Sequence, residues 1–106
     1  MKNYIVVIPA RLKSKRLPFK PLINIKGLPM IIRTYNQCSK VVPKKNIIIA
    51  TDSKQILNIC NRYGSNAILT SKKCKTGTDR VAEVSKKIKA KIYINLQGDE
   101  PIFPPK

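Results

Sequence analysis

The stretch Tyr4-Ile5-Val6-Val7-Ile8 runs directly into Pro9-Ala10-Arg11, and this junction sets the centre of the molecule. A continuous apolar run rich in β-branched side chains predicts a strand that is covered on both faces, as in a parallel sheet. The segment after it begins with proline and turns strongly basic. Ligands of open parallel sheets bind beyond the carboxyl ends of the strands. We therefore expect the chemistry of this protein directly after its first strand.

Strands alternate with helices along the rest of the chain. Further strands are expected at residues 46–50, 66–69 and 91–96, with a short extended piece at 22–25 inside a proline-rich loop. Helices are expected from Pro29, after residues 51–53 and after residues 76–78, where capping residues or proline stand. This alternation predicts right-handed crossovers and an α/β fold, a three-layer sandwich around a mostly parallel sheet.

Each expected helix has one apolar face that should pack on the sheet. Pro43 should end the first helix pattern and Gly64 should follow the second helix as its C′ residue. The residues expected on the inner faces are, in chain order, Ile31, Tyr35 and Cys38, then Ile56, Ile59, Cys60 and Tyr63, then Val81, Val84 and Ile88.

The length of 106 residues allows one hydrophobic core, so we expect a single domain over residues 1–106. No apolar run approaches the roughly 20 residues of a membrane span, and the first residues lack the pattern of a secretory signal. We expect a cytoplasmic protein without a membrane partner. Its three cysteines, Cys38, Cys60 and Cys74, have no paired short spacing, which favours free thiols over disulfides or a zinc site.

The net charge of +17 by itself suggests a polyanionic partner. The lysines are spread over nearly every segment, however, and no arginine-rich tail or interleaved aromatic platform is present. A nucleic-acid-binding module is therefore disfavoured. The five acidic residues are more informative, because they fall in or beside the segments that follow the expected strands.

The basic loop at residues 9–20 combines several cations with the hydroxyl of Ser14. Guanidinium groups bind phosphate oxygens bidentately and ammonium groups act as point charges, so such a loop can hold a triphosphate and stabilise a leaving pyrophosphate. It has neither the glycine-rich dinucleotide pattern nor the Walker pattern. On composition alone, an ordinary solvated basic loop explains it equally well.

Two further motifs follow later strands. Gln97-Gly98-Asp99-Glu100-Pro101 places carboxylates where Mg²⁺ could join bound phosphates, although a polar turn set by glycine is the simpler interpretation. Thr76-Gly77-Thr78-Asp79-Arg80 could bind an anion at a helix start, but Asp79 suits a helix cap better. Thr51-Asp52 is also interpreted as a helix cap.

The residues of these motifs, and their order along the whole chain, resemble the CMP-KDO synthetases, which are the 3-deoxy-manno-octulosonate cytidylyltransferases. The resembling segments are Ile8-Pro9-Ala10-Arg11, Ser14, Arg16-Leu17-Pro18, Lys20-Pro21-Leu22, Gly27-Leu28-Pro29-Met30-Ile31, Ala50-Thr51-Asp52, Thr76-Gly77-Thr78-Asp79-Arg80 and Asn95-Leu96-Gln97-Gly98-Asp99-Glu100-Pro101. The CMP-sialic acid synthetases share the first signature. The last two motifs resemble the KDO enzymes more specifically.

The resemblance implies an enzyme that transfers CMP from CTP to KDO, releases pyrophosphate and serves lipopolysaccharide synthesis. It also implies a Rossmann-like nucleotide-diphospho-sugar transferase fold, Mg²⁺ as cofactor and a homodimer. By matching position, Arg11, Lys20 and Asp99 would be catalytic, the first two on the triphosphate and Asp99 as metal ligand. The resemblance also implies three further groups of contacts. The backbone at Pro9 and Ala10 would face the cytosine base, and Ser14 and Arg16 would belong to the phosphate-binding loop. Gln97 and Arg80 would line the cytidine or sugar side.

Two departures from the family qualify what the resemblance implies. Family members are roughly twice this length or more, so the fold is expected to be incomplete at its carboxyl-terminal side. Cys74 also stands where the family usually has histidine, with Lys75 and Asp79 in place of the commoner Gln and Glu. A truncated product that binds nucleotide without turnover, and a CMP-sialic acid synthetase-like enzyme, are the alternatives.

Overall fold

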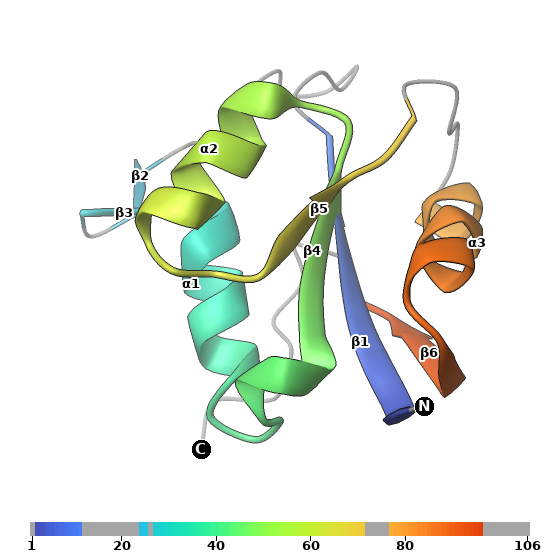
Figure 1. The fold of residues 1–106 in the computed structure, drawn as a ribbon. Coiled ribbons are helices and arrows are strands. Elements are labelled where there is room, and N and C mark those ends of the chain that lie inside the picture. Colours follow the sequence, from blue (N-terminus) through green and yellow to red (C-terminus); the bar gives the residue numbers. More distant parts are fainter. Residues whose placement is uncertain (1, 12–23, 26, 72–76, 97–106) are drawn as a thin grey trace.

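A parallel four-stranded sheet forms the middle of the protein (Figure 1). The computed structural model describes residues 2–11, 24–25, 27–71 and 77–96. The strand order is β5-β4-β1-β6, with β1 at Lys2–Ala10, β4 at Ile47–Thr51, β5 at Ala67–Leu69 and β6 at Ala90–Asn95. The apolar run after residue 3 is therefore a central strand, as predicted.

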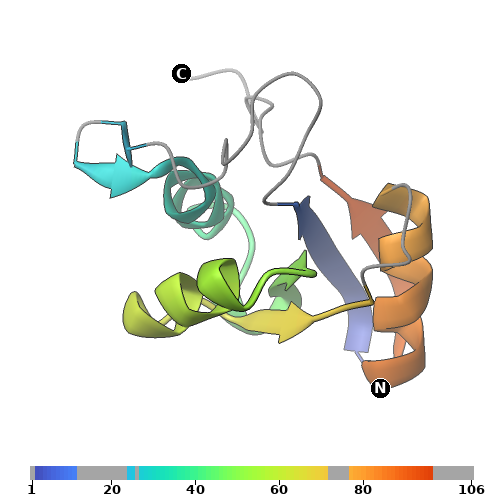
Figure 2. The same ribbon diagram turned by 90° about the horizontal axis from the view of Figure 1, so that it is seen from above.

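Helices cover both faces of this sheet, which gives the predicted three layers. Helices α1 (Met30–Cys38) and α2 (Lys54–Arg62) lie on one side of β1, and α3 (Gly77–Lys87) lies on the other (Figure 2). A short 3-10 helix, η2 (Lys44–Asn46), leads into β4. The extended piece expected in the proline-rich loop is a small antiparallel pair, β2 (Asn24–Ile25) and β3 (Leu28–Pro29), directly before α1.

The alternation of side chains along β1 divides the core into two halves. Val6 and Ile8 pack toward α1 and α2, whereas Ile5 and Val7 pack toward α3. All four are at most 4% exposed. The predicted inner-face residues follow this division: Ile31, Tyr35, Cys38, Ile56 and Cys60 are buried in the first half with Ile59 packed against it, and Val84 is buried in the second with Val81 and Ile88 beside it.

Local capping explains where α2 begins and ends. The Ser53 Oγ accepts a hydrogen bond from the Ile56 amide at 3.3 Å, which satisfies one of the unpaired amides of the first turn. Gly64 follows the helix with φ +73°, a conformation that side chains with a Cβ rarely adopt. The prediction for Tyr63 is wrong. It is 47% exposed because it is the C-cap residue, where the helical spacing ends.

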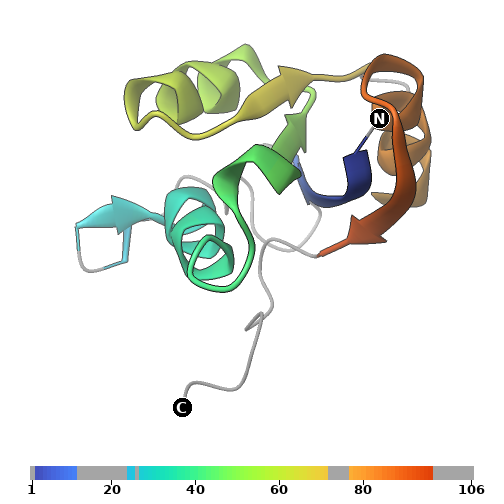
Figure 3. The same cartoon turned by 60° about the horizontal axis from the view of Figure 1, so that its bottom comes forward.

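One part of the sheet remains uncovered by the described chain. Ile92 and Ile94 on β6 are 60% and 45% exposed and lie on the α1 side of the sheet, since they pair with Tyr4 and Val6. Figure 3 shows β6 along the outside of the sheet, apart from α1. Within the described residues, β6 therefore offers an apolar face and a free edge.

Within the described ranges, no helix is long and apolar enough to cross a bilayer, and no three metal-ligating side chains cluster. Cys38 and Cys60 are buried free thiols, as predicted, and Cys74 lies outside the described residues.

Ile49 tests the packing of the sheet, because it is fully buried in β4. Replacement by alanine removes apolar contacts and leaves a cavity, so Ile49→Ala should lower the free energy of unfolding by about 2–4 kcal/mol in urea denaturation. Val41→Ala is the matched control, because Val41 is 60% exposed. A control loss as large as that of Ile49→Ala would contradict this packing.

Burial raises the pKa of Cys60 to about 11 from an ordinary value of 9.0. The folded state thus disfavours the thiolate. The contribution of this thiol to the free energy of unfolding is therefore complete below pH 9 and is lost as the pH rises toward 11. The unfolding free energy of the native chain should fall by ~2 kcal/mol more than that of Cys60→Ala over this interval. Comparison of the two chains cancels the titration of lysines and tyrosines. Parallel pH profiles would refute the burial of the thiol.

Candidate functional site

Three neighbouring strands end together at one edge of the sheet. The last residues of β1 and β4 are register partners, and so are the last residues of β4 and β5. The next residues along the chain are Arg11, Asp52 and Thr70, which therefore form a row that we call the carboxyl edge. The Thr70 amide donates a hydrogen bond of 2.7 Å to the Thr51 carbonyl and ties two of these ends together.

Arg11 stands at one end of this row, after β1, the strand that lies between β4 and β6. Its side chain is exposed, whereas Ala10 before it is buried and Pro9 is half-buried. An exposed guanidinium at the end of a buried strand can bind phosphate oxygens bidentately. The geometry thus places the cation predicted to hold triphosphate at the edge where parallel sheets bind ligands.

Arg80 reaches the same edge from α3, beneath the surface. Its side chain is 1% exposed, whereas most other charged residues of α3 are exposed to solvent. Its Nη1 donates to the Thr70 Oγ1 at 2.7 Å, and its Nη2 lies 3.6 Å from the Asp52 Oδ2. A buried guanidinium requires such partners, because desolvation of an unpaired charge is costly. Arg80 therefore links the ends of β4 and β5.

Glu83 makes a second link between α3 and the end of β5. Its Oε2 accepts a hydrogen bond of 2.7 Å from the Ser71 amide and lies 3.9 Å from the Lys87 Nζ, one helical turn away. Lys87 also donates to the Leu69 carbonyl at 3.0 Å. The chain leaving β5 is thus held by three side chains of one helix, Arg80, Glu83 and Lys87.

The prediction that Asp52 caps α2 is wrong. Ser53 is the N-cap, and the Thr51 Oγ1 accepts from the Ser53 amide at 3.1 Å. Asp52 is drawn to Arg80 instead, since the buried cation provides a stronger partner than a backbone amide. Sequence reasoning missed this ion pair and the role of Thr70, because both depend on the contact between α3 and the sheet.

Among the predicted site residues, the structure describes Pro9, Ala10, Arg11 and Arg80. Arg11 and Arg80 both belong to the carboxyl edge, one exposed and one buried. The other predicted site residues lie outside the described ranges: Ser14, Arg16, Lys20, Gln97 and Asp99. Their roles remain predictions.

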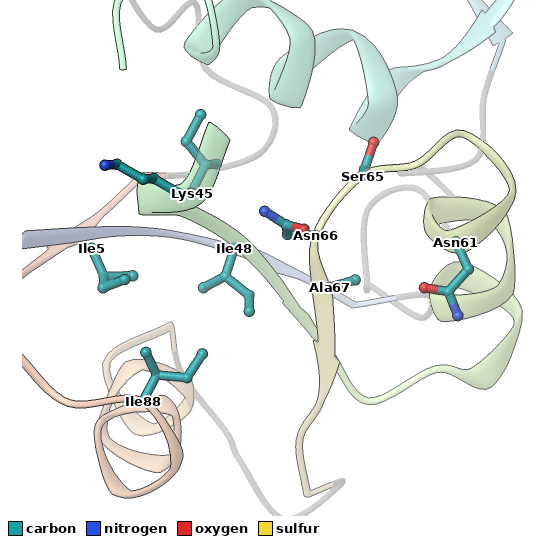
Figure 4. A pocket seen from close by; sticks show the side chains of 9 residues that line it. Ile5, Lys45, Ile48, Asn61, Ser65, Asn66, Ala67 and Ile88 are labelled. Atoms are coloured by element: carbon teal, nitrogen blue, oxygen red, sulfur yellow. The ribbon is translucent and has the colours of Figure 1, made fainter. Parts of the chain in front are cut away.

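A surface pocket lies at the opposite end of the sheet (Figure 4). The side chains of Ile5, Ile48 and Ile88 lie near one another there, between the early parts of the strands and the end of α3. Asn66, directly before β5, also lines it, and its Nδ2 donates to the Lys44 carbonyl at 2.8 Å. Its position at the amino ends of the strands separates this pocket from the carboxyl edge.

Comparison with known proteins gives a consistent result for the whole chain. A family model described as cytidylyltransferase matches residues 5–106. The chain is 46% identical over 101 residues to a 3-deoxy-manno-octulosonate cytidylyltransferase of Chloroherpeton thalassium, with 95% of this chain and 41% of the relative covered. It is 43% identical over 106 residues to the enzyme of that name from Escherichia coli, with 100% and 43% covered.

Solved structures show the same fold. The chain superposes on a CMP:2-keto-3-deoxy-manno-octonic acid synthetase complexed with CTP with a TM-score of 0.89, at 43% identity, covering 96% of this chain and 42% of that one. A Leptospira borgpetersenii cytidylyltransferase at 16% identity has a TM-score of 0.77, with 93% and 42% covered, and supports the fold alone. The chain therefore spans about two fifths of the length of these relatives.

Ser53 offers a test of the local structure behind Asp52. Ser53→Ala removes the acceptor for the Ile56 amide and should lower the free energy of unfolding by ~1 kcal/mol in urea denaturation. Ser85→Ala is the control, because the Ser85 hydroxyl bonds a carbonyl within α3 at an exposed position and alanine favours helix. Equal losses in both variants would contradict the assigned cap.

Proposed function

Because the chain belongs to the cytidylyltransferase family, we propose that it is the nucleotide-binding half of an enzyme that transfers CMP from CTP to KDO. The products would be CMP-KDO and pyrophosphate, for lipopolysaccharide synthesis. The observation that carries this proposal is the exposed guanidinium of Arg11 at the carboxyl end of the central strand. The similarity to a synthetase complexed with CTP supports it, at 43% identity and a TM-score of 0.89.

In the proposed transfer of CMP, the protein contributes mainly by positioning the substrates and by neutralising their charge. The anomeric hydroxyl oxygen of KDO attacks the α-phosphate of CTP and its proton is released to water. Pyrophosphate leaves with the electrons of the broken P–O bond. Arg11 and Lys20 are proposed to hold the triphosphate and to stabilise charge on the leaving group. Ser14 and Arg16 belong to the same loop, and the backbone at residues 9–10 is proposed to face the cytosine.

Mg²⁺ is the proposed cofactor, and Asp99 its proposed ligand. The carboxylates that the structure describes near the carboxyl edge have partners, since Asp52 pairs with Arg80 and Glu83 accepts from the Ser71 amide. We therefore propose that the oxygen ligand of Mg²⁺ comes from the motif around Asp99, because carboxylates are ligands that this ion prefers. When bound, the ion would neutralise phosphate charge and polarise the reacting group.

The sugar side of the site is proposed to involve Gln97 and Arg80. Arg80 is buried, so it would act on the substrate indirectly, through the residues that it contacts. The partners proposed are CTP and KDO, with a second copy of the complete enzyme as in the resembled homodimers, and with neither nucleic acid nor membrane. The cytoplasm is the proposed location, because CTP is a cytoplasmic nucleotide.

A specific observation keeps a second function in view. The exposed Ile92 and Ile94 lie on a sheet face that the described chain does not cover, and the chain spans about two fifths of its relatives' length. A protein that binds CTP without turnover is consistent with this exposed face. A CMP-sialic acid synthetase-like activity has less support, because the compared relatives at 40–48% identity have KDO-enzyme names.

Nucleotide binding can be measured by calorimetry on the purified chain with CTP and MgCl₂. Arg11→Ala should weaken CTP binding at least about tenfold, because it removes a charge-assisted phosphate contact. Arg62→Ala is the matched control, since Arg62 is exposed at the end of α2 that lies away from the carboxyl edge. Absence of CTP binding, or equal affinity of both variants and the native chain, would refute the nucleotide site.

Turnover separates the two functions. Pyrophosphate release is measured with CTP, KDO and MgCl₂, and omission of KDO is the control. Release that depends on KDO would establish the enzyme. CTP binding without release would favour the nonenzymatic product, whereas release with a sialic acid in place of KDO would favour the third activity.

A further inference from the structure

Asp52 presents an electrostatic difficulty for a triphosphate site. It directly follows Thr51, the register partner of Ala10, and Arg11 directly follows Ala10. A carboxylate beside Arg11 would repel a polyphosphate and would compete with it for the guanidinium. The side chain of Asp52 is half-buried at this edge, in the described fold.

Arg80 provides a neighbouring cation that pairs with the Asp52 carboxylate. Its guanidinium comes from α3, in the helix layer beside the sheet, and its Nη2 lies 3.6 Å from the Asp52 Oδ2. The other arm of the same planar group donates to the Thr70 Oγ1 at 2.7 Å, which fixes its orientation. Arg80 is 1% exposed and Asp52 19%, so solvent screens this pair less than a surface pair.

We propose that Arg80 is a positioning residue that neutralises Asp52 and holds it on the α3 side of the carboxyl edge. Arg11 is thereby left to bind a polyphosphate, the ligand class that the site takes. This inference rests on the proposed function and deepens it, since it assigns a buried residue to the phosphate site without direct contact.

A purely structural pair is the alternative, and stability does not favour it. Replacing a buried ion pair by apolar residues is often neutral or stabilising, so packing alone does not require arginine at this position. The location gives the pair a role instead, because it lies in the row that contains Arg11 and ties two strand ends whose backbones are already bonded.

The experiment removes each charge separately and together. Affinities for sodium tripolyphosphate and for CTP with MgCl₂ are measured by calorimetry on five chains: native, Arg80→Met, Asp52→Asn, the double variant, and Arg80→Met combined with Glu83→Gln. The last is the matched charge control, because Glu83 lies on the same helix but bonds the Ser71 amide. Circular dichroism verifies that each chain is folded.

Arg80→Met should weaken binding of both ligands about tenfold, because an unpaired carboxylate then faces Arg11 and the phosphates. Adding Asp52→Asn should restore the affinity to within about threefold of the native chain, whereas adding Glu83→Gln should not. A merely structural role would not give rescue at Asp52 alone. Asp52→Asn by itself should leave the affinity unchanged within about threefold, because the carboxylate is already neutralised in the native chain.

Failure to rescue at Asp52, or equal rescue by Glu83→Gln, would overturn the inference. So would a loss of about tenfold or more in Asp52→Asn, since Asp52 would then contact the ligand or its metal. This last measurement can overturn the inference even where Arg80→Met does not fold. UTP with MgCl₂ is measured on the native chain as well. Rescue seen with tripolyphosphate, together with equal native affinities for CTP and UTP, would support the inference and overturn the proposed function. Native binding of neither ligand would overturn both.

Discussion

The pairing of β1 with β4 on one side and β6 on the other is the constraint on which the rest of the molecule depends. Parallel neighbours on both sides satisfy the backbone of β1, and both of its faces are buried. Parallel strands need crossover connections, which place helices on both faces of the sheet. The same pairing brings three strand ends to one edge, so the core and the candidate site have one origin.

The two faces of β1 contribute differently. Val6 and Ile8 anchor α1 and α2, which carry the chain from one parallel strand to the next. Ile5 and Val7 anchor α3, and this helix provides the side chains that hold the ends of β4 and β5. The packing of α3 is therefore linked to the carboxyl edge, because Val84 in the core and Arg80 at the edge lie one turn apart.

Among the residues that the structure describes, none covers the α1 side of β6. Ile92 and Ile94 continue the apolar surface of β1 beyond the reach of α1. An edge strand with an exposed apolar face is an aggregation hazard or a docking place. The relatives are more than twice as long as this chain. The candidate site, by contrast, is built around β1, β4, β5 and α3.

Local sequence was sufficient for the order of the four sheet strands and the three α-helices, and for the position of Arg11. Apolar runs, prolines and Gly64 mark strands and helix ends through backbone preferences that act over a few residues. The edge at which the chemistry should lie also followed, because parallel strands end on the same side. The motif resemblance identified the family, which the comparisons confirm.

Tertiary structure decided the environment of the charges. Asp52 has the local pattern of a helix cap, yet it pairs with Arg80, which is 28 residues away in the chain and comes from another layer. The resemblance implies a place for Arg80 toward the cytidine or sugar, and in the structure it is buried beside Thr70. Desolvation and partner distance govern both outcomes. These quantities arise when α3 packs on the sheet, so neighbouring residues in the sequence could not reveal them.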